Sequence, residues 1–334
     1  MNALLPGRDP LRAEVVPGRP ATVVVRRRPD PAAWVGEHRE ELDALVRRHG
    51  AVLIAGLPVT RPSAVAAVRG ALGLPAAGWR ERFAAGRELA DGVWSAPEWP
   101  ADREQCLHHD EGYGVEFPLL LLIACLTPAN SGGAMLLGDT RAVLDALPAG
   151  LVARFRAEGW RFDRTFRPHF GPSWSEAFGV DEPAAVEKVC AERLIGFQWL
   201  PDGVLRLTRR RSAVVSHPVT GDECWFNDVG FFSRWSVDTT ERNLLLSAFG
   251  KRGLPFDTWF GDGGAIDEAA WRSILDAYDA VTVRLPWRAG DLLLLDNLLT
   301  AHGREPYAGP WQLAVAPADP VPLTACRPTV TPSS

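Results

Sequence analysis

Lysine, disulfide motifs and long apolar runs are scarce or missing in this 334-residue sequence. Only Lys188 and Lys251 are lysines among 36 basic residues, so arginine is too common for any single one to indicate function. The five cysteines are odd in number and form no C-x-x-C pair, which favours a reduced, cytoplasmic protein. The longest apolar run, around 120–126, falls short of the roughly 18 residues that a membrane helix needs.

The net charge is −5 and the sequence pI is about 5.9. A chain that lacks a basic excess is not expected to bind nucleic acid or an anionic membrane as its main partner. Residues 1–16 contain no basic segment followed by an apolar one, so we expect no secretion signal.

The composition, 46% hydrophobic and 23% charged, excludes a disordered chain. No internal repeat or Gly/Ser linker divides the sequence, so we expect one domain over residues 1–334. We expect a helical insert over about 150–280 and a loosely held, proline-rich tail over 317–334.

Apolar periodicity predicts helices near the N-terminus and mostly strands after about residue 105. The expected helices cover 36–49, 62–73, 140–147, 182–194 and 267–279, and the expected strands cover 51–58, 119–126, 213–218, 281–286, 291–296 and 311–316. This order predicts a mainly β fold with flanking helices, as a β-sandwich or open barrel.

Two histidine motifs carry the chemical signal. His108 and Asp110 are two residues apart, so in a strand an imidazole and a carboxylate would share one face. His302 follows an apolar strand near the C-terminus. Two histidines and one carboxylate form the ligand set of mononuclear non-haem Fe(II) oxygenases. An H-x-D motif alone is a weak signal, because most are surface or turn residues.

The context of these motifs resembles the taurine dioxygenase-like (TauD/TfdA) Fe(II)/2-oxoglutarate oxygenases. The resemblance extends in register from about residue 40 to 316, and the branch near syringomycin-biosynthesis aspartate hydroxylase and the clavaminate synthase-like enzymes is the most similar. The segments that carry it are 50–57, 97–114, 125–143, 164–178, 217–227, 259–263 and 286–310.

The resemblance implies a double-stranded β-helix (jelly-roll) core with His108, Asp110 and His302 as iron ligands. It also implies dioxygen and a small-molecule substrate as reaction partners, with 2-oxoglutarate as co-substrate. Because Asp110 occupies the position that a halide would need, halogenation is disfavoured. An amino-acid-derived substrate in specialised metabolism follows from the resemblance alone. A carrier-protein tether for that substrate is an option that the sequence does not reveal.

The 2-oxoglutarate subsite departs from the family pattern. Where the family has threonine after a Gly-Gly pair this chain has Met135, whose thioether cannot donate a hydrogen bond. Where the family has two arginines after the distal histidine, this chain has Trp311 and Gln312. Neither side chain supplies a charge, so we expect altered or lost use of 2-oxoglutarate.

Four further residues are candidates for the substrate pocket. They are Trp94, Trp99, Trp225 and Asn227, and core packing is the alternative for each. His109 and Glu111 alternate with the proposed ligands and should face away from the metal. His217 is expected to be a structural histidine. The arginine run 209–211 is expected to be a solvated face.

The sequence therefore predicts an Fe(II)-dependent oxygenase or oxidase with an altered co-substrate requirement. Two alternatives stay open at this point. One is an ordinary 2-oxoglutarate-dependent hydroxylase that takes its arginine from elsewhere in the chain. The other is a non-catalytic binding protein on the same fold, which the intact His/Asp/His set argues against.

Overall fold

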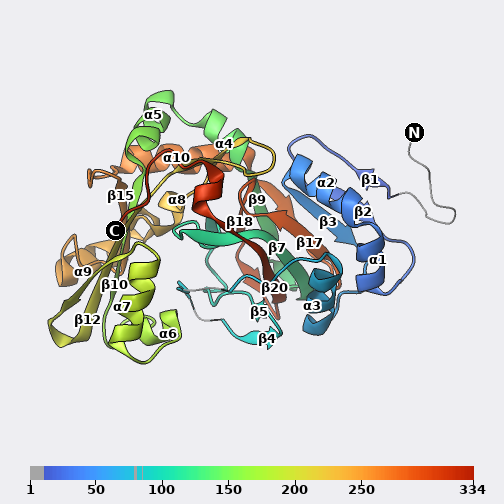
Figure 1. The fold of residues 1–334 in the computed structure, drawn as a ribbon, viewed down its shortest axis with the longest axis horizontal. Coiled ribbons are helices and arrows are strands. Elements are labelled where there is room, and N and C mark those ends of the chain that lie inside the picture. The colour runs from blue at the N-terminus through green and yellow to red at the C-terminus, as the bar shows by residue number, and fades with distance from the viewer. Residues whose placement is uncertain (1–10, 79–80, 85) are drawn as a thin grey trace.

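The computed structural model describes residues 11–78, 81–84 and 86–334 (Figure 1). Within them, eight strands form the largest sheet, in the order β1-β2-β3-β17-β7-β20-β5-β4. Its β2–β3 pair is parallel, and the other pairs are antiparallel. The strands are β1 Ala13–Glu14, β2 Ala21–Val24, β3 Ala51–Ala55, β4 Glu88–Ala90, β5 Val93–Ser95, β7 Glu116–Thr127, β17 Leu292–Asp296 and β20 Gln312–Pro322.

A second, four-stranded sheet packs against the first. Its order is β16-β9-β18-β6, with bounds β16 Val283–Leu285, β9 Met135–Asp139, β18 Thr300–Arg304 and β6 Gln105–His108. One buried cluster fills the space between the sheets, with side chains from β7, β17 and β20 on one side and from β9 and β16 on the other. Two small pairs complete this region, β8 Ser131–Gly132 with β19 Tyr307–Ala308 and β13 Val214–Ser216 with β14 Glu223–Trp225.

Strand β7 shows why one sheet carries a continuous apolar run. Leu121 and Ile123 face the other sheet, whereas Leu122 and Ala124 face a cluster beneath the N-terminal helices. A strand that is covered on both faces needs apolar residues at successive positions rather than at alternate ones. The covering helices are α1 Pro31–Glu37, α2 Arg39–His49 and α3 Pro62–Ala71, which lie together with β1–β3 on one side of Figure 1.

Part of the segment between the two halves of the metal motif, about 149–281, forms a separate layer on the other side of Figure 1. It contains an antiparallel sheet in the order β11-β12-β10-β15, so the expected helical insert has strands as well as helices. These strands are β10 Trp160–Phe166, β11 Gly196–Leu200, β12 Val204–Arg211 and β15 Phe256–Phe260. The helices in and around this layer are α4 Thr140–Ala146, α5 Ala149–Glu158, α6 Trp174–Phe178, α7 Pro183–Glu192, α8 Val229–Phe232, α9 Thr239–Phe249 and α10 Glu268–Val281.

The C-terminal segment is ordered, which corrects the expectation of a loose tail over 317–334. Strand β20 continues to Pro322 and pairs with β7 along its length. A short 3-10 helix, Leu323–Cys326, buries both of its end residues, and Ser333 then bridges to Arg210 on β12. The segment therefore connects the large sheet to the inserted layer.

The arginine run on β12 corrects a second expectation. Arg209 and Arg211 are each 1% exposed and alternate with partly exposed residues, as the two faces of a strand require. Arg209 pairs with Glu81, which also pairs with Arg164 of β10. Arg211 donates to the backbone carbonyl oxygens of Tyr113 and of residues 193, 194, 210 and 333. The run is therefore a buried bonding network.

The sequence-based elements are otherwise confirmed as strands and helices at the expected places, with two refinements. The helix expected over 36–49 is broken at His38 into α1 and α2. The expected β-rich fold is a mixed α/β arrangement of several sheets with helices on their outer faces. Among the helices in the described residues, none is long and apolar enough to cross a bilayer.

Candidate metal centre

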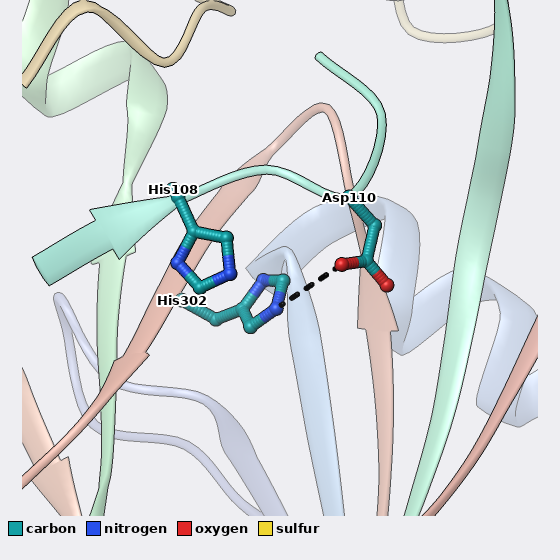
Figure 2. Close-up of side chains that lie close together, drawn as sticks. All are labelled: His108, Asp110 and His302. Atoms are coloured by element: carbon teal, nitrogen blue, oxygen red, sulfur yellow. Dashed lines mark ion pairs between the residues drawn. The ribbon is translucent and has the colours of Figure 1, made fainter. Parts of the chain in front are cut away.

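His108, Asp110 and His302 converge in space although the motif is divided in sequence (Figure 2). His108 ends β6 and lies opposite His302 of the antiparallel strand β18. From the H-x-D spacing we expected Asp110 in the same strand as His108. Asp110 instead lies in the turn after β6. One ligand atom from each residue lies within 4.8 Å of the others, and His302 Nε2 is 4.0 Å from Asp110 Oδ1.

The hydrogen bond of His108 fixes which ring nitrogen is free. Its Nδ1 lies 2.9 Å from the carbonyl oxygen of Cys106. A carbonyl oxygen only accepts, so Nδ1–H donates and Nε2 keeps its lone pair for a ligand bond. In His302, Nε2 faces the carboxylate, and the buried Nδ1 has no hydrogen-bond partner among the described residues.

The electrostatics of the three side chains fit a divalent cation. Burial lowers the pKa of His108 and lowers that of His302 well below its ordinary value, so both rings are neutral ligands. Burial, and then the neighbouring Asp228, raises the pKa of Asp110 to about 7, because no positive group compensates its charge. A bound cation would supply that compensation. Two neutral imidazoles and one carboxylate are the ligand set of mononuclear non-haem iron.

Two polar side chains that the sequence analysis missed hold the ligand-bearing turn. The Asn297 amide oxygen accepts from the backbone N–H of Asp110 at 3.0 Å, and its amide nitrogen donates to the Asp110 carbonyl oxygen at 2.9 Å. Asp228 accepts from the backbone N–H of His109 at 2.8 Å. Both residues are buried. In the sequence each is a polar residue beside an apolar segment, and that pattern is the one signal that could have pointed to them.

Asp296 turns the chain from β17 into β18, which carries His302. Its Oδ1 accepts the backbone N–H groups of Leu298 and Leu299, both at 2.9 Å. Its Oδ2 lies 2.9 Å from Nε2 of His217, which confirms the expected structural role of that histidine. This turn places β18 in the opposite sheet from β17.

The residues that alternate with the ligands are buried, and they line the same small cavity as His108 and Asp110, although Nδ1 of His109 and the carboxylate of Glu111 have partners elsewhere. His109 Nδ1 lies 3.2 Å from the carbonyl oxygen of Asn227 and 3.8 Å from Asp228 Oδ1. Glu111 lies 4.0 Å from Arg193 and has a positive φ of 54°. Both side chains therefore support the metal-binding turn.

Aromatic rings fill the space in front of the metal ligands. Phe231 stacks on His108 at 4.7 Å between ring centroids, and Phe83 meets the same imidazole edge-on at 6.2 Å. The cavity that His108 and Asp110 line with Phe83 and Phe232 holds only about 30 Å³. That volume is about the share of one water molecule in the liquid.

The four predicted pocket residues divide into two pairs. Trp99 packs on Phe231 at 5.3 Å, one ring away from His108, and Trp94 lies under the guanidinium of Arg82, which lines the iron-side cavity. None of the four predicted residues lines that cavity, and for Trp225 and Asn227 burial favours the alternative of core packing. Both are fully buried, Trp225 in an apolar core and Asn227 in hydrogen bonds to backbone groups of residues 213 and 229.

The three residues at the expected co-substrate subsite do not face the same way, because two pack on the core between the sheets and one faces solvent. Met135 is buried in the core between the sheets, opposite Arg304 on β18. Trp311 packs against the same core, stacks on Tyr307 at 5.0 Å, and leaves its indole N–H without a partner among the described residues. Gln312 is exposed. Of the two positions without arginine, only 311 therefore faces the space between the sheets.

Comparisons with known proteins agree with this geometry. The family described as "Taurine catabolism dioxygenase TauD, TfdA family" matches residues 19–315. The dapdiamide synthesis protein DdaC of Enterobacter agglomerans is 30% identical over 280 residues, which cover 84% of this chain and 85% of that protein. A clavaminate synthase-like protein of Arabidopsis thaliana is 23% identical and covers 80% of this chain and 81% of its own.

Solved structures show the same fold at lower identity. The PvcB protein of Pseudomonas aeruginosa superposes with a TM-score of 0.56 at 17% identity, over 95% of this chain and 96% of that one. A second structure of PvcB, described as an Fe, alpha-ketoglutarate dependent oxygenase from an isonitrile synthetic pathway, gives 0.52 at 18% identity, over 95% of this chain and 94% of that one.

Proposed function

The chain belongs to the TauD/TfdA dioxygenase family and is an Fe(II)-dependent oxygenase with a His-Asp-His triad, and from this premise we propose its substrate class and co-substrate use. We propose that it oxidises an amino-acid-derived small molecule in specialised metabolism. The naming of one relative as a dapdiamide synthesis protein supports this proposal. A carrier-protein tether for the substrate stays a prediction from sequence.

We propose further that the two facing sheets form a double-stranded β-helix and that the chain belongs to the clavaminate synthase-like branch. The crossing of β17 into β18 from one sheet to the other supports the first point. The clavaminate synthase-like relative supports the second. A closer relation to syringomycin-biosynthesis aspartate hydroxylase remains a prediction.

The residues of the centre have separable roles in this proposal. His108, Asp110 and His302 hold ferrous iron, which when bound supplies dioxygen activation at its open coordination positions. Asn297 and Asp228 keep the turn that carries Asp110 in place. The rings of Phe231 and Phe83 exclude water in front of His108.

The co-substrate proposal depends on one observation: neither position at which the family has its carboxylate-binding arginine carries one here, and the nearby guanidinium of Arg304, which lies 5.3 Å over Trp311, is held by backbone carbonyl oxygens. Met135 and Trp311 occupy the inward positions, and Gln312 is exposed. A hydrogen bond to a charged group contributes about 1.5–3 kcal/mol, against about 1 kcal/mol for a neutral one. We therefore propose weakened or lost binding of 2-oxoglutarate in the usual pose.

One observation favours the second candidate, a conventional 2-oxoglutarate-dependent hydroxylase. Arg82 lines the cavity of His108 and Asp110, so a cation from a different part of the chain is near the metal ligands. That guanidinium would take over the role of the missing arginine in binding the far carboxylate.

Anaerobic reconstitution with Fe(II) and titration with 2-oxoglutarate tests the two candidates. Iron binding without a visible charge-transfer band, even at high 2-oxoglutarate, is the result expected from the first. A saturable band that disappears in Arg82→Gln and persists in the exposed control Arg87→Gln supports the second. A band that is equal in wild type and Arg82→Gln contradicts the role given to Arg82.

A further inference from the structure

A second, larger cavity lies next to the metal centre. It holds about 240 Å³ and shares two lining residues, Phe83 and Phe232, with the small cavity of His108 and Asp110. The two rings are 5.8 Å apart and meet edge-on, so they form a common wall. The volume is somewhat below the roughly 300–1,000 Å³ that small-molecule sites span, so it suits a compact ligand.

The walls of this cavity are mainly aromatic. Phe83, Phe166, Phe170, Phe232 and Phe256 line it, together with the aliphatic side chains of Leu245 and Leu254. Aromatic walls of this kind favour a planar ring or a compact apolar group, through edge-to-face contacts and removal of apolar area from water. The cavity is too small for a second domain or a peptide, so the occupant is a small molecule or one arm of it.

Three arginines reach the cavity, and two of them pair with a buried carboxylate. Arg164 donates to Glu81 at 3.0 Å. Arg234 pairs with the buried carboxylate of Asp257. Glu81 is shared with Arg209, but both guanidiniums at the cavity are already held by a buried carboxylate.

The third arginine, Arg242 on α9, differs from the other two. It packs over Trp235 at 4.7 Å and reaches the hydroxyl of Thr239 at 3.4 Å, with no carboxylate partner among the described residues. The adjacent Glu241 also lines the cavity, and its carboxylate lies 3.5 Å from Arg103. Arg242 is therefore a cation at the edge of an apolar cavity.

We propose that this cavity binds the substrate of the oxygenase, and that the substrate is an anion with an aromatic or compact apolar body. The body packs among the phenylalanines, and its carboxylate, or a group of equal charge, pairs with Arg242. Phe83 and Phe232 lie between this body and the metal ligands. The part of the substrate that is oxidised therefore has to reach past these two rings to the metal. This inference rests on the proposed function, because it takes the metal centre to be the place of reaction.

The test uses 3-phenylpropanoate as a probe in anaerobic calorimetry on the Fe(II)-loaded protein. The neutral 3-phenylpropan-1-ol, the cationic 3-phenylpropylamine and the ringless propanoate serve as comparisons. We expect the aromatic anion to bind at least about tenfold more tightly than each of the other three, because only it satisfies both the walls and Arg242.

Two pairs of variants on or near α9 locate the site. Leu245→Trp fills the cavity, whereas Leu244→Trp changes a neighbour that is 67% exposed and does not line it. No side chain of α9 is fully buried, so both variants are expected to fold. Arg242→Gln removes the proposed anion partner, and Arg252→Gln removes an exposed arginine outside the cavity.

We expect Leu245→Trp to weaken 3-phenylpropanoate at least about tenfold with no change in Leu244→Trp. We expect Arg242→Gln to weaken the anion about tenfold and to leave the neutral alcohol unchanged, with no effect of Arg252→Gln. Equal binding of the probe in both leucine variants, or no binding to the wild type, would overturn the proposal. Iron content is measured on every sample, so a failure to hold iron is recorded against the proposed function and not against the cavity.

Discussion

The side chain of Asn297 binds both polar atoms of the Asp110 backbone. It accepts from the N–H at 3.0 Å and donates to the carbonyl oxygen at 2.9 Å, although 187 positions separate the two residues. The same amide nitrogen also donates to the carbonyl oxygen of Pro118. A single buried amide therefore holds the backbone of Asp110, and through it the position of the one carboxylate in the metal triad.

Replacing Asn297 with alanine is expected to destabilise the fold and weaken iron binding. The change leaves buried backbone groups of Asp110 without partners, at about 1–3 kcal/mol for each group. Loss of such a supporting contact lowers metal affinity by roughly 10–100-fold. Urea unfolding and Fe(II) titration measure the two effects. Asn243→Ala, at an exposed asparagine, is the control, and equal iron affinity in both variants would contradict the assignment.

Loss of any metal ligand is expected to abolish stoichiometric iron binding. His108→Ala, Asp110→Ala and His302→Ala each leave two donors, too few for a stable site of this class. His169→Asn changes an exposed histidine of positive φ and is expected to bind iron as the wild type does. Metal analysis after anaerobic gel filtration gives the stoichiometry, and one iron per chain retained in His302→Ala would refute this triad.

Restoring a cation at position 311 is expected to strengthen 2-oxoglutarate binding. Trp311 faces the space between the sheets and Gln312 is exposed, so Trp311→Arg combined with Met135→Thr rebuilds the carboxylate contact. One charge-assisted bond is worth about 1.5–3 kcal/mol, or roughly tenfold or more in affinity. The same titration of Gln312→Arg is the control. A stronger effect of Gln312→Arg would mean that position 312 is the inward one.

Glu81→Gln is expected to destabilise the protein at neutral pH. Burial alone would raise the pKa of Glu81, but the guanidiniums of Arg209 and Arg164 outweigh it and hold that pKa below the ordinary value of 4.5. Removing the charge leaves two buried arginines without their partner, at a cost of about 3–5 kcal/mol.

The pH dependence of this effect has a definite sign. A carboxyl with a depressed pKa stabilises the fold above its unfolded pKa, and that contribution is lost as the pH falls through the folded value. The difference between wild type and Glu81→Gln should therefore be full at pH 7 and shrink below about pH 4. Urea unfolding at both pH values measures it, with the exposed Glu98→Gln as control. A constant difference across this range would show that charge is not the cause.

The five free thiols are expected to be unreactive in the folded protein. Burial raises the pKa of Cys106, Cys125, Cys224 and Cys326 to about 12 and that of Cys190 to about 11. Only the thiolate reacts with a disulfide reagent. A chromogenic disulfide at pH 8 should therefore label none of them until urea is added, and then all five. Rapid labelling of one thiol in buffer would contradict its burial.

The metal triad could be predicted from sequence because its ligands lie in short motifs whose spacing reflects local geometry. The supporting residues could not, since Asn297 and Asp228 reach the turn of Asp110 only through the tertiary fold. Phe83 was missed for the same reason. It meets His108 from a segment that carries no motif.

The incorrect predictions have a common physical cause. Arg209 is buried on an alternating strand because its partner, Glu81, lies 128 positions away, and no local pattern reveals such a partner. Trp225 and Asn227 were assigned to the pocket from the segment that contains them, but the strand β14 turns this segment into the core. The proline-rich residues 317–322 form the end of β20 and pair with β7, so they are not a loose tail.

In the sequence, His108 and Asp110 precede the inserted layer and His302 follows it, so roughly 200 residues separate the two histidines along the chain. A metal ion bound to both closes this long loop, and it binds the folded state in preference to the unfolded one. The consequence concerns turnover: we expect the iron-free protein to open more often between these strands and to be cut faster by proteases, which limited proteolysis with and without Fe(II) measures. On this expectation, iron supply sets the lifetime of the polypeptide as well as its activity.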